Sequence, residues 1–262
     1  MRNLRAVYII WYRDILRFWH DRMRMMGAIT MPLLFLFIFG SGLSASMSLA
    51  DTPIPYIDFM FPGIIGMTVL TSALMGGTSL VWDKEFGFLK EVLVAPVSRA
   101  SVATGKVLGA ATIALIPGLI IMIFAPIIGV EFSILTVLKL LPLMFLLAIS
   151  VSSMGILLAT RMKSMEAFQM IMQLLMMPMI FLSGVFFPLK GLPVWLNFLT
   201  KVNPASYGVA PIREVVLGKT ISDPLGISLF GHTMTLWENV AIVAVFGVVM
   251  IILAMWSFSH QE

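Results

Sequence analysis

Long apolar runs are the feature that most constrains this chain. A helix that crosses the hydrocarbon core of a bilayer needs about 20 predominantly apolar residues. Six runs reach that length without Asp, Glu, Lys, Arg or His in their cores; they cover about residues 26–45, 59–80, 107–128, 140–159, 168–187 and 239–257. Prolines interrupt the first five, which spans tolerate where neighbouring helices satisfy the freed backbone groups. The runs predict an all-α integral membrane protein with six transmembrane helices in a single transmembrane domain, residues 25–262.

Composition supports a membrane protein and excludes several kinds of site. The chain is 60% hydrophobic and only 11% charged, whereas soluble domains are about a quarter charged. It has no cysteine, which excludes disulfides, thiolate nucleophiles and cysteine metal sites. Its three histidines, His20, His232 and His260, are far apart in the sequence. We therefore expect no metal site and no cofactor in this chain, and no stretch indicates nucleic-acid binding.

Residues 1–24 are amphipathic at helical spacing. The apolar face groups Leu4, Val7, Tyr8, Trp11, Ile15, Phe18 and Trp19. The opposite face groups Arg2, Arg5, Arg13, Asp14, Arg17, His20, Asp21 and Arg24. Arginine is costly at the centre of a spanning helix, so we expect an interfacial helix that contacts membrane lipid. This helix could serve as an anchor for the first span and nothing more, or it could in addition transmit force or contact a partner.

The placement of basic residues predicts the orientation in the membrane. With the N-terminus inside, segments 1–25, 81–106, 160–167 and the C-terminal tail hold twelve of the basic residues, and the outer segments hold five. Both termini are therefore expected on the cytoplasmic side. Loop 81–106 is then cytoplasmic, and the long connection 188–238 is external.

Loop 81–106 is an island of charge between two apolar runs. We expect a short helix that begins at Asp83 or Lys84 and ends before Pro96. Its apolar residues, Phe86, Leu89, Val92 and Leu93, fall close together on one side. Such a helix can insert into a groove on a soluble partner, or it can rest on lipid headgroups.

The external segment 188–220 contains two short apolar stretches, 194–202 and 205–217, with the turn signal Asn203-Pro204 between them. Two short apolar helices between spans predict a re-entrant hairpin that dips into the membrane and is buried against protein. Arg213 is expected to pair with a carboxylate, for which Glu214 is nearest in sequence, or with carbonyl groups.

Polar and methionine side chains recur at helical spacing in the second and fifth runs. They are Thr68, Thr71, Ser72, Met75 and Ser79 in one, and Gln169, Gln173, Met176, Met177 and Ile180 in the other. Ordinary hydrogen bonding between helices would explain them. A mildly polar, methionine-rich path for varied apolar ligands would also explain them.

Two groups of motifs resemble those of one known family. The first is Leu182-Ser183-Gly184, Phe187-Pro188, Pro193-x-Trp195, Asn203-Pro204, Tyr207 and Arg213; the second is Lys84-Glu85-x-Gly87 followed by Pro96-x-Ser98-Arg99. Together with the six runs, they resemble type-2 ABC transporter permeases, the membrane subunits of drug, polysaccharide and lipo-oligosaccharide exporters. The resemblance covers essentially the whole chain. Pro211 departs from the family pattern and puts the local helix geometry in doubt.

The resemblance implies roles for three groups of residues. A coupling helix would dock on a separate ATP-binding subunit through Asp83, Lys84, Glu85, Phe86, Gly87, Leu89, Glu91, Val92, Leu93, Pro96 and Arg99. A substrate pathway would be lined by Thr68, Thr71, Ser72, Met75, Gln169, Gln173, Met176, Met177 and Ile180. An external gate would contain Gly184, Phe187, Pro188, Pro193, Trp195, Asn203, Pro204, Tyr207 and Arg213.

The resemblance also implies partners and a location. Two copies of the permease would form the pathway with two ATP-binding subunits in the plasma (inner) membrane of a prokaryote. ATP and Mg²⁺ would bind the partner, because Gly105-Lys106 lacks the upstream glycine and the following Ser or Thr of a phosphate-binding loop. The expected cargo is a lipophilic drug or lipid-like molecule, or alternatively a lipid-linked polysaccharide or lipo-oligosaccharide.

Two other functional classes of membrane protein would require residues that this chain lacks in its predicted spans. An ion-coupled secondary transporter usually carries ionisable residues within its spans, and the six cores lack them. An intramembrane enzyme would need a cluster of metal ligands or a nucleophile with a base, and neither is evident in the spans. The chain itself is therefore not expected to be an enzyme.

Overall fold

The computed structural model describes residues 2–44, 55–89, 91, 96–130, 132–189, 191–218, 225–229 and 232–259. Its elements are helical apart from one short antiparallel strand pair. The helices are α1 (Arg2–His20), α2 (Arg22–Ser44), α3 (Tyr56–Leu74), α4 (Thr78–Glu85), α6 (Arg99–Ile123), α7 (Ala125–Ile128), α8 (Ile134–Arg161), α9 (Met165–Phe181), α10 (Val194–Val202), α11 (Pro204–Leu217) and α13 (Leu236–Ser259). The 3-10 turn η1 (Met75–Gly77) joins α3 to α4, and strand β1 (Ser228–Leu229) pairs with β2 (His232–Thr233). The all-α prediction is confirmed.

Five helical segments within the described residues are long and apolar enough to cross a membrane: Arg22–Gly40, Tyr56–Glu85, Arg99–Ile123, Ile134–Arg161 and Leu236–Ser259. The predicted fifth span, 168–187, forms a shorter helix than these five. Helix α9 has 17 residues and ends at Phe181, before the left-handed Gly184. A helix of that length rises about 25 Å, less than the roughly 30 Å of a hydrocarbon core. The expected continuous helix to residue 187 is therefore wrong, and six complete spans remain a prediction.

The second span extends further than its apolar run. It continues through η1 and α4 to Glu85, so a new helix does not begin at Asp83 or Lys84 as expected. Gly87, with φ of 77°, follows the end of α4 and adopts the left-handed conformation that glycine tolerates best. The charged island, residues 81–106, thus starts inside the span helix, and its separate part begins only after this glycine.

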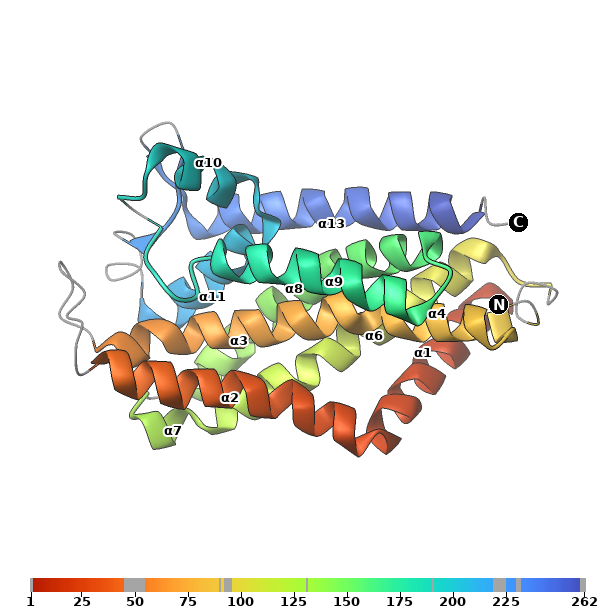
Figure 1. Ribbon diagram of the computed structural model, residues 1–262, viewed down its shortest axis with the longest axis horizontal. Helices are drawn as coiled ribbons and strands as arrows, with labels where there is room; N and C mark the ends of the chain where they lie inside the picture. Colours follow the sequence, from red (N-terminus) through yellow and green to blue (C-terminus); the bar gives the residue numbers. More distant parts are fainter. Residues whose placement is uncertain are drawn as a thin grey trace.

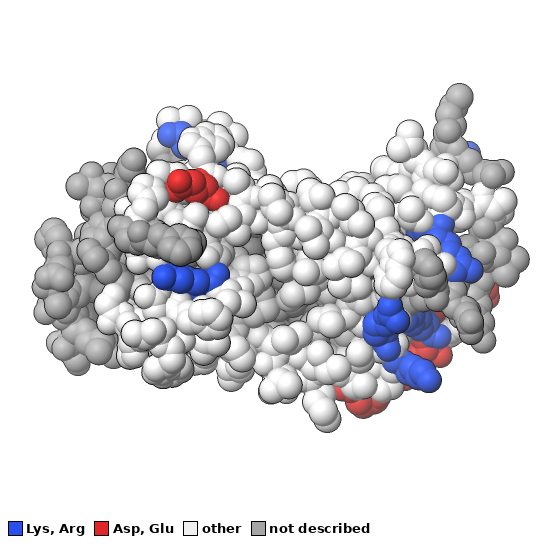
Figure 2. Space-filling model, turned by 90° about the horizontal axis from the view of Figure 1, so that it is seen from above, with Lys and Arg blue, Asp and Glu red and all other residues white. Residues whose placement is uncertain are grey.

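The long helices lie roughly along one axis, with both chain ends at the same end of the molecule (Figure 1). The opposite end carries α7, α10 and α11 (Figure 1). Helix α3 is the most central, since it packs against α2, α6, α8 and α11. Charged side chains gather toward the two ends of the face in Figure 2, and the band between them is uncharged. This distribution fits a molecule whose middle lies in lipid.

The two short helices expected in the external segment are present as α10 and α11. Helix α11 packs against α3, α8 and α13, and most of its residues are buried. Helix α10 instead exposes several large apolar side chains, which are Val194, Trp195, Phe198, Leu199 and Val202. Whether this hairpin enters the bilayer stays a prediction. Residues 190, 219 and 220 of the expected hairpin lie outside the described residues.

Candidate functional site

Helix α1 packs along α6 through a face that combines apolar and acidic side chains. Ile10, Asp14 and Phe18 are buried on this face. Gly105 permits the close approach, because a Cβ there would lie 3.0 Å from the Cβ of Ile10. The predicted grouping of Asp14 with an outward polar face is therefore wrong. The face of α1 turned away from the protein exposes mainly large apolar side chains, which are Leu4, Tyr8, Ile9, Tyr12, Leu16 and Trp19.

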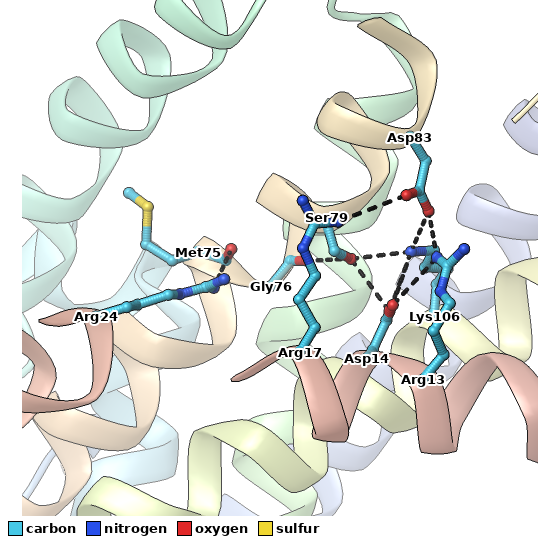
Figure 3. A network of polar contacts seen from close by, with 9 residues as sticks. All are labelled: Arg13, Asp14, Arg17, Arg24, Met75, Gly76, Ser79, Asp83 and Lys106. Atoms are coloured by element: carbon cyan, nitrogen blue, oxygen red, sulfur yellow. Dashed lines mark hydrogen bonds and ion pairs between the residues drawn. The ribbon is translucent and has the colours of Figure 1, made fainter. Parts of the chain in front are cut away.

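A buried ionic cluster joins α1, α4 and α6 (Figure 3). The Lys106 ammonium lies 3.1 Å from a carboxylate oxygen of Asp14 and 2.6 Å from Asp83 Oδ2. It also donates a hydrogen bond of 3.1 Å to Ser79 Oγ. Arg13 pairs with both carboxylates. The side chains of Lys106, Asp14 and Asp83 are only 2%, 3% and 7% exposed.

Because this cluster is buried, each of its charged groups depends on the groups that it contacts. Each ion has lost its water, so it is tolerated only while the opposite charges and hydrogen bonds remain in place. The two carboxylates are balanced by Lys106 and Arg13, with Arg17 3.7 Å from Asp83. Sequence reasoning missed this network, although Gly105 and Gly109, four residues apart on α6, are both positions where α1 approaches closely.

The residues expected to couple to a partner divide into inward and outward groups. Asp83 belongs to the ionic cluster, and Leu89 is only 6% exposed. Lys84 Nζ donates to the carbonyl oxygens of Ala159 and Thr160, at the C-terminal end of α8. The outward group is Glu85, Phe86, Glu91, Pro96 and Arg99. Val92 and Leu93 lie outside the described residues.

A groove of about 520 Å³ lies between α1 and the end of α4. Its lining combines aromatic and basic side chains: Arg13, Leu16, Arg17, His20, Trp82, Asp83, Phe86 and Phe88. The guanidinium carbon of Arg17 lies 4.4 Å from the centre of the Trp82 ring, and that of Arg13 lies 4.4 Å from the centre of Phe88. Phe86 is 78% exposed at this site. An exposed aromatic beside a basic groove is a surface on which another protein can dock.

Most of the expected pathway residues meet at a second feature, a cavity lined mainly by apolar side chains. This cavity of about 440 Å³ lies between α2, α3 and α9. Six of the expected residues line it: Thr71, Ser72, Met75, Met176, Met177 and Ile180. The other three do not. Thr68 is buried and donates to Ile64 O within its own helix, while Gln169 and Gln173 lie on the exposed side of α9.

Several of the expected gate residues connect α11 to the turn after α9. Arg213 is buried, donates to Gly184 O and lies over the Phe59 ring at 4.2 Å, so a carbonyl is one of its partners as expected. Burial lowers the pKa of this guanidinium to about 10, which leaves it charged at neutral pH. Asn203 Nδ2 donates to Met179 O at 2.8 Å, and its side-chain oxygen caps α11 by accepting from Ala205 N.

The remaining residues expected in the gate differ from one another in burial and in contacts. The Tyr207 hydroxyl donates to Lys201 O at 2.7 Å and so ties α11 to α10. Phe187 and Pro188 are partly buried, whereas Pro193 and Trp195 are exposed. Pro204 occupies the first position of α11, where a missing N–H costs nothing. Pro211 lies inside α11 without ending it, so the doubt about local helix geometry is resolved.

Comparison with known proteins decides the family. The model of a family described as ABC-2 type transporter matches residues 5–217. The chain belongs to the ABC-2 type transporter family. The resemblance drawn from the motifs is thereby confirmed.

Named relatives of this ABC-2 chain are transport permeases and a nodulation protein. The putative transport permease ycf38 of Cyanophora paradoxa is 30% identical over 72% of this chain and 66% of its own length, slightly less than two thirds. The inner membrane transport permease YadH of Escherichia coli K12 is 28% identical over 86% of this chain and 88% of its own. Nodulation protein J of Rhizobium leguminosarum bv. viciae is 25% identical over 84% and 82%.

Proposed function

We propose that this chain is the membrane-spanning permease subunit of an ATP-driven exporter, with ATP and Mg²⁺ bound by a separate ATP-binding subunit. The family match carries the proposal. Two permease chains and two ATP-binding subunits would form the transporter in a prokaryotic inner membrane, the membrane named for the relative YadH. The proposed cargo is a lipophilic drug or lipid-like molecule, which the largely apolar lining of the 440 Å³ cavity supports.

The docking surface in this proposal is the outward group of the loop, centred on Phe86. Movement of the ATP-binding subunit would displace the end of α4 at this residue. Asp83 lies on the same helix and is held by Lys106 and Arg13, so α1 and α6 would move with α4. Because α4 continues through η1 into α3, the displacement would reach Met75 at the wall of the cavity.

The test is copurification with the cognate ATP-binding subunit. Phe86→Asp puts a charge on a 78% exposed ring position, so it is expected to reduce recovery of the complex at least tenfold and abolish vanadate-sensitive ATP hydrolysis. Leu89→Asp is a poorer test, because Leu89 is buried and the change would also disturb packing within the chain.

Phe198→Asp is the matched control. Phe198 is 65% exposed on α10, at the opposite end of the molecule (Figure 1). It should leave copurification unchanged. If Phe86→Asp copurifies as well as Phe198→Asp, the docking assignment is wrong.

A further inference from the structure

Among the described residues, Arg24 is the one charged side chain that lines the cavity between α2, α3 and α9. The sequence placed Arg24 on the polar face of the interfacial helix, but the structure places it in the first turn of α2, where it lines the cavity. Its guanidinium donates to Met75 O, a contact separate from the ionic cluster (Figure 3). Met75 precedes Glu85 by ten residues, so this contact lies about 15 Å along the helix axis from the end of α4.

Arg24 has no carboxylate within ion-pair distance among the described residues. The nearest acid in sequence, Asp21, accepts from the backbone N–H of Arg24 rather than from its guanidinium. Arginine carries five N–H donors and stays protonated in proteins, and among the described residues only Met75 O accepts a hydrogen bond from this guanidinium. Asp21 and Asp14 therefore act on the Arg24 guanidinium only at longer range. An anionic group bound in the cavity would add the direct ion pair that the described residues do not form.

The rest of the cavity is suited to a hydrocarbon chain. Its wall is made of apolar side chains with several flexible methionines, and the principal ones are Met31, Phe35, Met67, Met176, Met177 and Phe181. Of the described residues in the lining, Thr71 and Ser72 are the only ones with uncharged polar side chains. A volume of about 440 Å³ falls in the range of small-molecule sites. One positive charge at one side of an apolar cavity is complementary to an amphiphile with a negative headgroup.

We infer that this cavity binds an anionic amphiphile, with Arg24 contacting the headgroup and the methionine and phenylalanine wall contacting the acyl chain. The inference rests on the proposed function, because it identifies the bound amphiphile as the class of cargo that would enter the transport pathway. A phosphate or a carboxylate headgroup satisfies the same chemistry, since both accept parallel hydrogen bonds from a guanidinium.

The experiment uses the purified full chain in nanodiscs of phosphatidylcholine, without the ATP-binding subunit. The probe is a long-chain alkyl phosphate that carries a photoreactive diazirine in its chain, and labelled positions are mapped by mass spectrometry. Probes with the same chain and a phosphocholine or trimethylammonium headgroup serve as comparisons. The phosphate probe is expected to label the cavity residues of α2 and α9 at least fivefold more than either comparison probe.

Two pairs of variants assign the contacts. Arg24→Gln keeps a donor for Met75 O but removes the charge, so labelling by the phosphate probe should fall to the phosphocholine level. Arg22→Gln makes the same charge change at an exposed position on the same helix and should have no effect. Ala28→Trp fills the cavity and should reduce labelling by every probe, whereas Met26→Trp, at an exposed position outside the lining, should not.

The outcomes separate the inference from the proposed function. Equal labelling by the phosphate and phosphocholine probes, or equal losses in Arg24→Gln and Arg22→Gln, overturns the anionic site. Should Arg24→Gln fail to fold, headgroup selectivity of the unmodified chain decides alone. If phosphatidylglycerol in the nanodisc competes with the probe, the occupant is a bilayer lipid. If phosphatidylglycerol does not compete, the occupant is a free amphiphile. Because the ATP-binding subunit is not needed here, a failed copurification leaves this result standing.

Discussion

At the scale of single residues, several buried and half-buried charges divide into two kinds. Lys106, Asp14 and Asp83 neutralise one another at the junction of three helices. Arg24 and Arg213 instead contact backbone carbonyls. The first kind holds the protein's own elements together. Arg24 differs because it also faces a cavity large enough for a ligand.

The cluster leads to a stability prediction. Lys106→Met would leave two buried carboxylates with Arg13 as their main counter-charge, so we expect it to lower the free energy of unfolding by about 3–5 kcal/mol. Thermal unfolding of the purified chain in nanodiscs, followed by circular dichroism, measures the change. Lys163→Met, at an exposed lysine, is the control and should leave the midpoint unaltered. Equal midpoints for both variants would contradict the structural role of the cluster.

At the scale of elements, the second span is held by backbone contacts that leave no room for side chains. A Cβ on Gly77 would lie 2.5 Å from Gly155 O, and one on Gly155 would lie 2.5 Å from Leu74 O. Helix α8 therefore meets the η1 turn almost backbone to backbone. This contact fixes the position of the turn whose first residue, Met75, lines the cavity.

Enlarging one of these glycines should separate the two helices. Gly155→Leu is expected to cost at least about 3 kcal/mol of stability, because the nearest atoms are backbone and cannot rotate away. Expression level and the thermal midpoint in nanodiscs report the loss. Gly42→Leu is the matched control, since no atom lies within 4 Å of a Cβ there. A stable Gly155→Leu variant would show that α8 and η1 can move apart freely.

At the scale of the whole molecule, the segments predicted to be cytoplasmic lie together. Arg99 donates to Ser259 O, and Lys84 donates to Thr160 O, so the loop, the α8 end and the α13 end share one end of the bundle. The N-terminus lies at the same end (Figure 1). This arrangement agrees with the excess of basic residues in those segments.

Cysteine labelling tests the orientation directly, because the chain has no cysteine of its own. With a membrane-impermeant maleimide, His232→Cys should be labelled in intact cells. His232 is exposed and lies 3.5 Å from Glu238 in the first turn of α13, at the opposite end of that helix from Ser259. Arg5→Cys, exposed on α1, should be labelled only after permeabilisation. The reverse pattern would overturn the cytoplasmic assignment of both termini.

The class of protein, most of the span positions and the family could be predicted from the amino-acid sequence alone. Those properties depend on local quantities. A span requires a run of apolar residues long enough for the bilayer, and a motif is a fixed spacing of residue types. The short helices α10 and α11 were predictable for the same reason, because Asn203-Pro204 marks the start of α11 wherever it packs.

The directions in which the charged side chains point depend instead on how the helices pack. Helical periodicity groups Asp14 with its neighbouring arginines, but the contact between α1 and α6 at Gly105 turns Asp14 inward to Lys106. The extension of the second span to Glu85 likewise buries Asp83, although its sequence neighbours suggest a surface loop. Ion pairs between residues far apart in sequence depend on how the helices pack, and periodicity within one helix carries no information about its partner.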